Sequence, residues 1–124
     1  MASTKTILVI DDEENIRRLY RDELGEAGYR VLTAAGWEEA RALLAATPPD
    51  LVTLDIRLGA GPDGIEILRL IKEARADLPV ILVTAYGEYR ADFAAWASEA
   101  YVVKSADLTE LKEQIAHAIG PGSP

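Results

Sequence analysis

The chain has 124 residues, of which 49% are hydrophobic and 27% are charged. This length and balance are typical of one globular domain, and they exclude two ordinary domains as well as a disordered or low-complexity chain. The net charge of −8, with scattered positive side chains, argues against direct binding to nucleic acid, and the absence of cysteine excludes disulfides, thiol catalysis and cysteine metal sites.

Five short apolar runs are the predicted strands. In chain order they are residues 7–10, 29–32, 51–54, 80–83 and 101–103. Most of these runs are continuous rather than alternating, which is typical of a parallel sheet covered by helices on both faces.

Stretches with helical spacing of apolar residues follow the strands. The stripes are Ile16, Leu19, Tyr20 and Leu24; Trp37, Ala40 and Leu44; Ile65, Leu68 and Ile71; Phe93, Trp96 and Ala97; and Leu108, Leu111, Ile115 and Ala118. We expect Gly25 and Gly28 to end the first helix, and Asp107 to cap the last one with Glu110 three residues on. The alternation of strand and helix predicts an α/β fold with right-handed crossovers and an open parallel sheet.

Chemically active side chains follow four of the five predicted strands. They are Asp11 and Asp12 after the first, Asp55 after the third, Thr84 after the fourth and Lys104 after the fifth. Because ligands of open α/β sheets bind outside the carboxyl ends of the strands, these residues are expected to converge on one edge.

The chemistry of this set points to phosphate. Clustered carboxylates repel one another unless a cation compensates, and oxygen-only ligands favour Mg²⁺ or Mn²⁺ over zinc. The Lys104 ammonium suits a phosphoryl oxygen, and the Thr84 hydroxyl can donate to another. The set predicts phosphoryl transfer in which a carboxylate such as Asp55 is the nucleophile.

With these motifs the chain resembles the receiver domain of two-component response regulators over residues 5–119. The resemblance rests on Asp11-Asp12, Asp55, Thr84-Ala85 and the segment from Tyr101 to Lys104. It implies a flavodoxin-like, doubly wound (βα)5 fold with a five-stranded parallel sheet in the order 2-1-3-4-5. Residues 1–120 would form this domain and residues 121–124 a flexible tail, as in a single-domain response regulator.

The resemblance also implies a role for each site residue. Asp55 would be the phosphoacceptor, and the metal would be held by Asp11, Asp12, Asp55 and the backbone carbonyl of Arg57. Lys104 would bind the phosphoryl group. Thr84 and Tyr101 would couple phosphorylation to the face formed by the fourth helix, the fifth strand and the fifth helix. The chain would then be a signalling switch rather than an enzyme.

Further expectations concern partners and location. The resemblance implies a histidine kinase or a phosphotransfer protein as phosphoryl donor and an unidentified protein as downstream target, and it leaves a weak or phosphorylation-dependent homodimer open. Exposed aromatic residues among Tyr89, Phe93 and Trp96 would mark a partner site. No apolar run approaches the roughly 20 residues of a membrane span, so we expect a cytoplasmic protein that does not contact membranes.

Two positions depart from the family pattern. Gly59 stands where the family usually has a proline after Asp55, and the loop to Asp63-Gly64 is one residue longer. Ser105 replaces the proline that usually follows Lys104 in a cis peptide. Because a cis bond before a non-proline residue costs about 3–4 kcal/mol, we expect a trans peptide here. We predict that the phosphotransfer chemistry survives these changes while the switching differs.

Arg57 and Tyr86 lie two residues past Asp55 and Thr84, at positions that tune dephosphorylation in the family. Both side chains are bulky enough to hinder a water molecule that attacks the acyl phosphate in line. We therefore predict slower self-dephosphorylation than small residues at these positions would give.

Simpler interpretations exist for each residue by itself: an acidic helix cap for residues 11–14, a turn for Asp55, a helix cap for Thr84 and a solvated lysine for Lys104.

Three other functions of the chain also stay open. The chain could be the receiver portion of a longer regulator with a DNA-binding or enzymatic output domain. It could be a receiver that binds partners without phosphate. It could also be a metal-dependent aspartyl-phosphate phosphatase, although such enzymes place Asp-x-Asp after the first strand, whereas here an adjacent pair is followed by Glu13.

Overall fold

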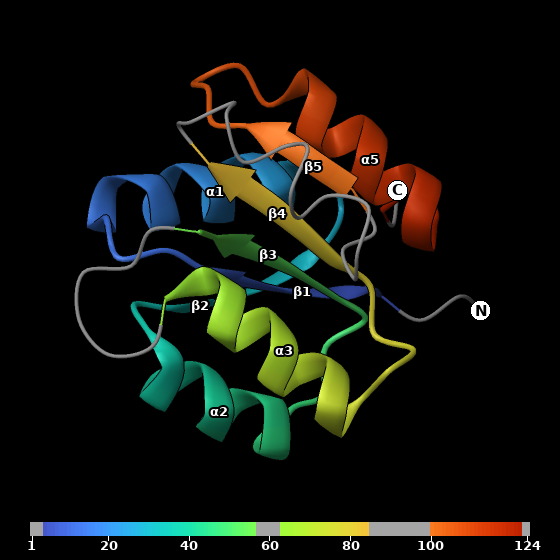
Figure 1. Ribbon diagram of the computed structural model, residues 1–124. Helices are drawn as coiled ribbons and strands as arrows, with labels where there is room; N and C mark the ends of the chain where they lie inside the picture. Colours follow the sequence, from blue (N-terminus) through green and yellow to red (C-terminus); the bar gives the residue numbers. More distant parts are fainter. Residues whose placement is uncertain (1–3, 57–62, 85–99, 123–124) are drawn as a thin grey trace.

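The computed structural model describes residues 4–56, 63–84 and 100–122, without the side chains of Thr84 and Tyr101. Within these residues, five parallel strands form one sheet in the order β2-β1-β3-β4-β5 (Figure 1). The strands are β1 (Thr6–Ile10), β2 (Arg30–Ala34), β3 (Leu51–Asp55), β4 (Val80–Thr84) and β5 (Ala100–Val103). The predicted flavodoxin-like sheet is confirmed, strand order included.

The second strand differs most from its predicted range of residues 29–32. It begins at Arg30 and continues to Ala34. Tyr29 is outside the strand because its N–H donates to the carbonyl oxygen of Leu24, at 3.1 Å, within the turn that ends the preceding helix. The sheet pairing therefore begins one residue later than the apolar run.

Four helices connect and follow the described strands. They are α1 (Glu14–Glu26), α2 (Trp37–Ala46), α3 (Gly64–Ala74) and α5 (Thr109–Ile119). Gly28, with φ of 99°, supplies the left-handed backbone of the turn after α1, while Gly25 lies inside that helix. The predicted stripe of Phe93, Trp96 and Ala97 lies outside the described residues. No helix in the described parts of the chain is long and apolar enough to cross a membrane.

The start of α5 keeps part of its predicted cap. Asp107 Oδ1 accepts hydrogen bonds from the Thr109 N–H at 3.0 Å and from the Thr109 hydroxyl at 2.6 Å. The Asp107 N–H donates to Ser105 Oγ at 3.1 Å, rather than to the Glu110 side chain that a capping box would use. The helix consequently begins at Thr109 with an aspartate turn before it.

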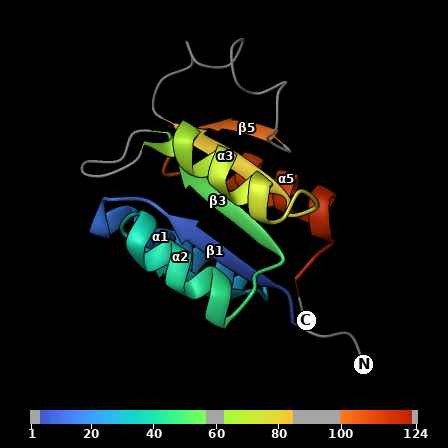
Figure 2. The same cartoon turned by 60° about the horizontal axis from the view of Figure 1, so that its bottom comes forward.

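Two hydrophobic clusters lie on opposite faces of the sheet (Figures 1 and 2). Successive residues of each strand alternate between them, so Leu8 and Ile10 belong to the cluster under α2 and α3, whereas Ile7 and Val9 belong to the cluster under α1 and α5. Trp37 packs against the first cluster, as expected of a helix-to-sheet contact. Helices on both faces leave the carboxyl ends of the strands as the place where side chains can meet a ligand.

The end of α5 is attached to the turn between α1 and β2. The buried Tyr29 hydroxyl donates to the Gly120 carbonyl oxygen at 2.9 Å, across 91 residues of sequence. A Cβ atom on Gly122 would overlap the carbonyl oxygen of Ala27, so these two backbone segments are in close contact. Residues 120–122 therefore pack on the domain.

Replacing Tyr29 with phenylalanine tests this attachment. The variant keeps the ring but leaves the Gly120 carbonyl without the hydroxyl donor, and we expect it to lower the free energy of unfolding by about 0.5–1.5 kcal/mol. Urea denaturation of both proteins measures the difference. Equal unfolding midpoints would show that the hydrogen bond adds nothing to stability.

Candidate functional site

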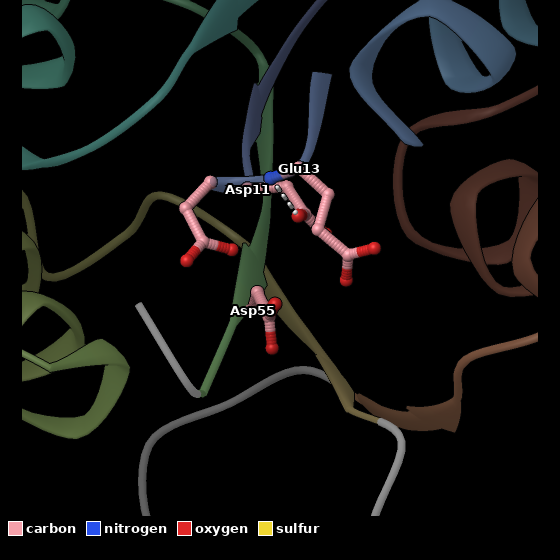
Figure 3. A group of neighbouring side chains, drawn as sticks. Asp11, Glu13 and Asp55 are labelled. Carbon is pink, nitrogen blue, oxygen red and sulfur yellow. Dashed lines mark hydrogen bonds between the residues drawn. The ribbon is translucent and has the colours of Figure 1, made fainter. Parts of the chain in front are cut away.

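The predicted acidic residues and Lys104 meet at the carboxyl edge of the sheet. Asp11 directly follows β1, Asp55 is the last residue of β3, and Lys104 directly follows β5. Figure 3 shows Asp11, Glu13 and Asp55 together at the ends of β1 and β3. The parallel strands thus bring together residues that are 93 positions apart in the chain.

Lys104 forms ion pairs with three carboxylates. Its Nζ lies 2.8 Å from Asp11 Oδ2, 3.0 Å from Asp55 Oδ2 and 3.0 Å from Glu13 Oε1. The side chains of Asp11, Asp55 and Lys104 are 3%, 6% and 12% exposed, so these charges interact with little screening by water. An ammonium group has three hydrogens, which matches these three partners.

Burial and neighbouring charges shift the pKa values of Asp11 and Lys104 in opposite directions. Burial raises the pKa of Asp11, and this effect outweighs its hydrogen bonds from Lys104 and from the Glu13 N–H at 2.9 Å. For Lys104, burial favours the neutral amine, but hydrogen bonds to Asp11, Glu13 and Asp55 prevail, and its pKa is raised. Burial, with a smaller effect of the Asp11 charge, also raises the pKa of Tyr20 to about 12. The site therefore favours the charged form of Lys104, whereas burial disfavours the charged form of Asp11.

The donor set fits a hard divalent cation. Asp11, Asp12, Glu13 and Asp55 each offer a carboxylate oxygen, and these oxygens lie within 4.8 Å of one another. Mg²⁺ prefers oxygen ligands. Asp11 and Asp55 are buried whereas Asp12 and Glu13 are exposed, so the cluster is open to water on one side. The same set is unsuited to soft metals, which prefer thiolate ligands.

Two contacts fix the backbone that carries Asp11. Its N–H donates to the Ala34 carbonyl oxygen of β2 at 3.1 Å, and its own carbonyl accepts from Arg17 Nη1 at 2.8 Å. Arg17 was not among the predicted site residues. The sequence feature that could have indicated this contact is the position of Arg17 in the first turn of α1, six residues after Asp11.

Gly64 is a second residue whose role the sequence analysis missed. A Cβ atom on it would overlap the Asp55 carbonyl oxygen and lie 2.5 Å from Ile56 Cα. Its N–H donates to the Ile56 carbonyl oxygen at 2.8 Å. The start of α3 thus rests directly on the backbone of the candidate phosphoacceptor, which only a glycine allows.

The other predicted site residues are described in part or not at all. Thr84 ends β4 and is paired in register with Val103, and Tyr101 is paired with Leu82, but their side chains lie outside the described part of the chain. Arg57 and Tyr86 lie outside it entirely, as do Tyr89, Phe93, Trp96 and Gly59 of the longer loop.

The structure also tests the expectation for the peptide bond that follows Lys104. The peptide bond between Lys104 and Ser105 is trans, as predicted, since the described residues contain no cis peptide. Lys104 still reaches Asp55 from this backbone.

Comparison with known families identifies the chain. The family model described as "Response regulator receiver domain" matches residues 7–116. The chain belongs to this family. Receiver domains are signalling switches of two-component systems rather than classical enzymes, and phosphorylation and Mg²⁺ binding are typical of them.

The receiver domain has relatives of several lengths. It is 43% identical over 86 residues to the phosphate regulon transcriptional regulatory protein PhoB of Pseudomonas aeruginosa, a match that covers 68% of this chain and 37% of PhoB. It is 40% identical over 82 residues to sporulation initiation phosphotransferase F of Bacillus subtilis, covering 66% of this chain and 65% of that protein. The chain therefore spans well under half of the length of PhoB.

Solved structures agree with the fold. The response regulator TrrA of Thermotoga maritima, in complex with Mg²⁺ and beryllofluoride, is 44% identical with a TM-score of 0.86, covering 93% of this chain and 99% of TrrA. A second structure shows TrrA in complex with the histidine kinase ThkA, with a TM-score of 0.85 and 98% of that chain covered. A similar receiver domain is thus known with a divalent cation and with a kinase.

Proposed function

We propose that Asp55 accepts a phosphoryl group from a histidine kinase or a phosphotransfer protein, with the help of Mg²⁺ held by Asp11, Asp12 and Asp55. The observation that carries this proposal is the ion pair of Lys104 with Asp55 and Asp11 at the carboxyl edge of the sheet. It marks a place where positive charge is stabilised beside a buried carboxylate. TrrA with Mg²⁺ and beryllofluoride, and TrrA with ThkA, support the same assignment.

The residues of this chain divide the work of the transfer. An Asp55 carboxylate oxygen attacks phosphorus, the bond from phosphorus to the donor histidine nitrogen breaks, and its electron pair returns to the imidazole ring. Lys104 then donates to an oxygen of the transferred group, with Thr84 as the second donor. A bound cation would neutralise charge on the phosphoryl oxygens, and we propose that the carbonyl of Arg57 completes its protein ligands and that Mn²⁺ can replace Mg²⁺.

We propose that the output is protein binding at the face of β5 and α5. Thr84 and Tyr101, in adjacent paired strands, would rearrange when Asp55 is phosphorylated and shift a pre-existing equilibrium between two conformations. On the described part of this face, Val103 is a large hydrophobic residue that is 39% exposed. Arg57 and Tyr86 would slow the hydrolysis of the acyl phosphate.

Intact-mass analysis after incubation with acetyl phosphate and Mg²⁺ tests the proposal. We expect one added phosphoryl group, and none in Asp55→Asn or with the metal chelated. A mass that stays unchanged while Mg²⁺ binds would contradict phosphoacceptance. An adduct that persists in Asp55→Asn would place the reaction on another residue.

The relatives suggest two settings for the same chemistry. In PhoB a matched segment is part of a longer transcriptional regulator, whereas TrrA is matched over nearly its whole chain. Phosphoacceptance on Asp55 serves either setting. The length of the open reading frame distinguishes an output domain on the same chain from a separate target protein.

A further inference from the structure

Glu13 is the third partner of Lys104, and the proposed chemistry gives it no role. Its side chain is 62% exposed, in contrast to the buried side chains of Asp11 and Asp55. It caps nothing, although it is the residue before α1, since it makes no side-chain hydrogen bond to the helix N-terminus. Its carboxylate is directed to Lys104 instead, at 3.0 Å, across 91 residues of sequence.

The backbone of Glu13 is well fixed for such a contact. Its N–H donates to Asp11 Oδ1 at 2.9 Å, and its carbonyl oxygen accepts from the Arg17 N–H at 3.1 Å in the first turn of α1. The carboxylate therefore starts from a backbone tied both to the site and to a helix. Such a pre-positioned group loses less conformational entropy when it holds a partner.

The proposed reaction engages two of the three partners of Lys104, Asp11 and Asp55, but not Glu13. A divalent cation takes oxygens of Asp11 and Asp55, and phosphorylation converts one Asp55 oxygen into an acyl phosphate oxygen. A bound cation would neutralise the carboxylate charge that holds Lys104 and repel its ammonium group, and phosphorylation would replace the Asp55 carboxylate with phosphoryl charge that lies further from Asp11. Glu13 stays available as an anchor on the open side of the cluster.

We propose that Glu13 is a positioning residue: it holds Lys104 beside the site when Asp11 and Asp55 are engaged by the cation, so that the ammonium group meets the incoming phosphoryl group. This inference rests on the proposed function and adds a residue to it. It gives Glu13 a purpose distinct from ligating the cation.

A role through charge alone makes the opposite prediction. The Glu13 carboxylate is close to where an anionic phosphoryl group would lie, so its charge by itself weakens anion binding. Removing that charge would then tighten the binding of a phosphoryl analogue. If Glu13 positions Lys104, its removal weakens the binding instead.

The test is calorimetric titration of beryllofluoride into the protein at saturating Mg²⁺, with Glu13→Gln compared to wild type. We expect roughly three- to tenfold weaker binding in Glu13→Gln, the size of a partly exposed charged hydrogen bond. The matched control is Glu14→Gln, which removes the same charge from the next residue along the chain. The Glu14 side chain is 73% exposed and is paired with Arg18 at 3.2 Å. The control is expected to bind as wild type.

A spectroscopic measurement reports the position of Lys104 directly. With Mg²⁺ bound, we expect the ¹⁵N-coupled proton signal of its ammonium group to persist in wild type and in Glu14→Gln, because a held ammonium exchanges slowly with water. It is expected to broaden or vanish in Glu13→Gln. A purely structural role of Glu13 would not produce this change.

Unchanged or tighter beryllofluoride binding in Glu13→Gln would overturn the inference while leaving phosphoacceptance by Asp55 intact. An equal loss in Glu14→Gln would do the same, by showing that the effect is not specific to the carboxylate that contacts Lys104. If wild type itself binds no beryllofluoride and takes no phosphoryl group from acetyl phosphate, the proposed function fails first, and the role of Glu13 falls with it.

Discussion

Asp11→Asn is expected to make the metal-free protein more stable than wild type at neutral pH, and to abolish its stabilisation by Mg²⁺. Asp11 is buried, and burial raises its pKa despite the ion pair with Lys104, so its charged form is disfavoured in the folded state. The amide removes that charge but keeps an oxygen that can accept the Glu13 N–H. Wild type at 100 times the dissociation constant of Mg²⁺ should gain about 2.7 kcal/mol, which the variant should lack.

The pH dependence of this difference has a definite sign. A carboxyl group whose pKa is higher in the folded than in the unfolded chain contributes stability below the ordinary value of 3.8, and that contribution is lost as the pH rises through the raised folded value. The advantage of Asp11→Asn over metal-free wild type should therefore grow from acidic pH towards neutrality and then level off. Urea unfolding at several pH values, with and without Mg²⁺, measures both effects.

Asp12→Asn is the matched control for Asp11→Asn. Asp12 belongs to the same group of carboxylates but is exposed, so relief of a burial penalty is absent there. We expect this variant to lose Mg²⁺ stabilisation without a gain in the metal-free state. A metal-free Asp11→Asn protein less stable than wild type would show that the Lys104 ion pair outweighs the cost of burial.

Gly64→Ala is expected to lower both stability and phosphoryl transfer. The added methyl group would overlap the Asp55 carbonyl oxygen, and because the obstacle is backbone, the strand end or the helix must move. Overpacking of this kind costs about 1–3 kcal/mol. A displacement of Asp55 by 1 Å would lower the transfer rate on the order of 100-fold. Urea unfolding and the initial rate of phosphorylation by acetyl phosphate measure the two losses.

Gly25→Ala separates a general glycine effect from the specific contact. Gly25 lies inside α1, and a Cβ atom on it would meet nothing within 4 Å. Alanine there should stabilise the protein by about 0.5–1 kcal/mol and leave phosphorylation unchanged. If Gly64→Ala behaves like Gly25→Ala, then the backbone near Asp55 has room that the structure does not indicate.

Most of the fold was predictable because its signals are local. A continuous apolar run such as residues 51–54 predicts a buried parallel strand, and Gly28 marks the turn that ends α1. The exception is instructive: Tyr29 looks like the first residue of β2 but belongs to the helix-ending turn. The strand order itself came from the family resemblance, because spacing alone does not determine which strands are neighbours.

The candidate site was predictable as a set of strand ends but not as a set of contacts. Asp11, Asp55 and Lys104 were expected at one edge, and the structure places them there. Glu13 was read only as part of an acidic helix start, since nothing local indicates a partner 91 residues away. Gly64 was named only as the end of the loop after Asp55, although a glycine in the first turn of a helix, soon after a buried strand, indicates a close backbone approach.

The two hydrophobic clusters have a consequence for how sequences of this kind can diverge. The sheet separates the side chains under α2 and α3 from those under α1 and α5, so we expect a substitution in one cluster to have little effect on the packing of the other. Substitutions without shared neighbours have nearly additive effects on stability. Each cluster can therefore accumulate its own neutral substitutions. One face of the domain can change to bind a new partner protein without compensating substitutions on the other face.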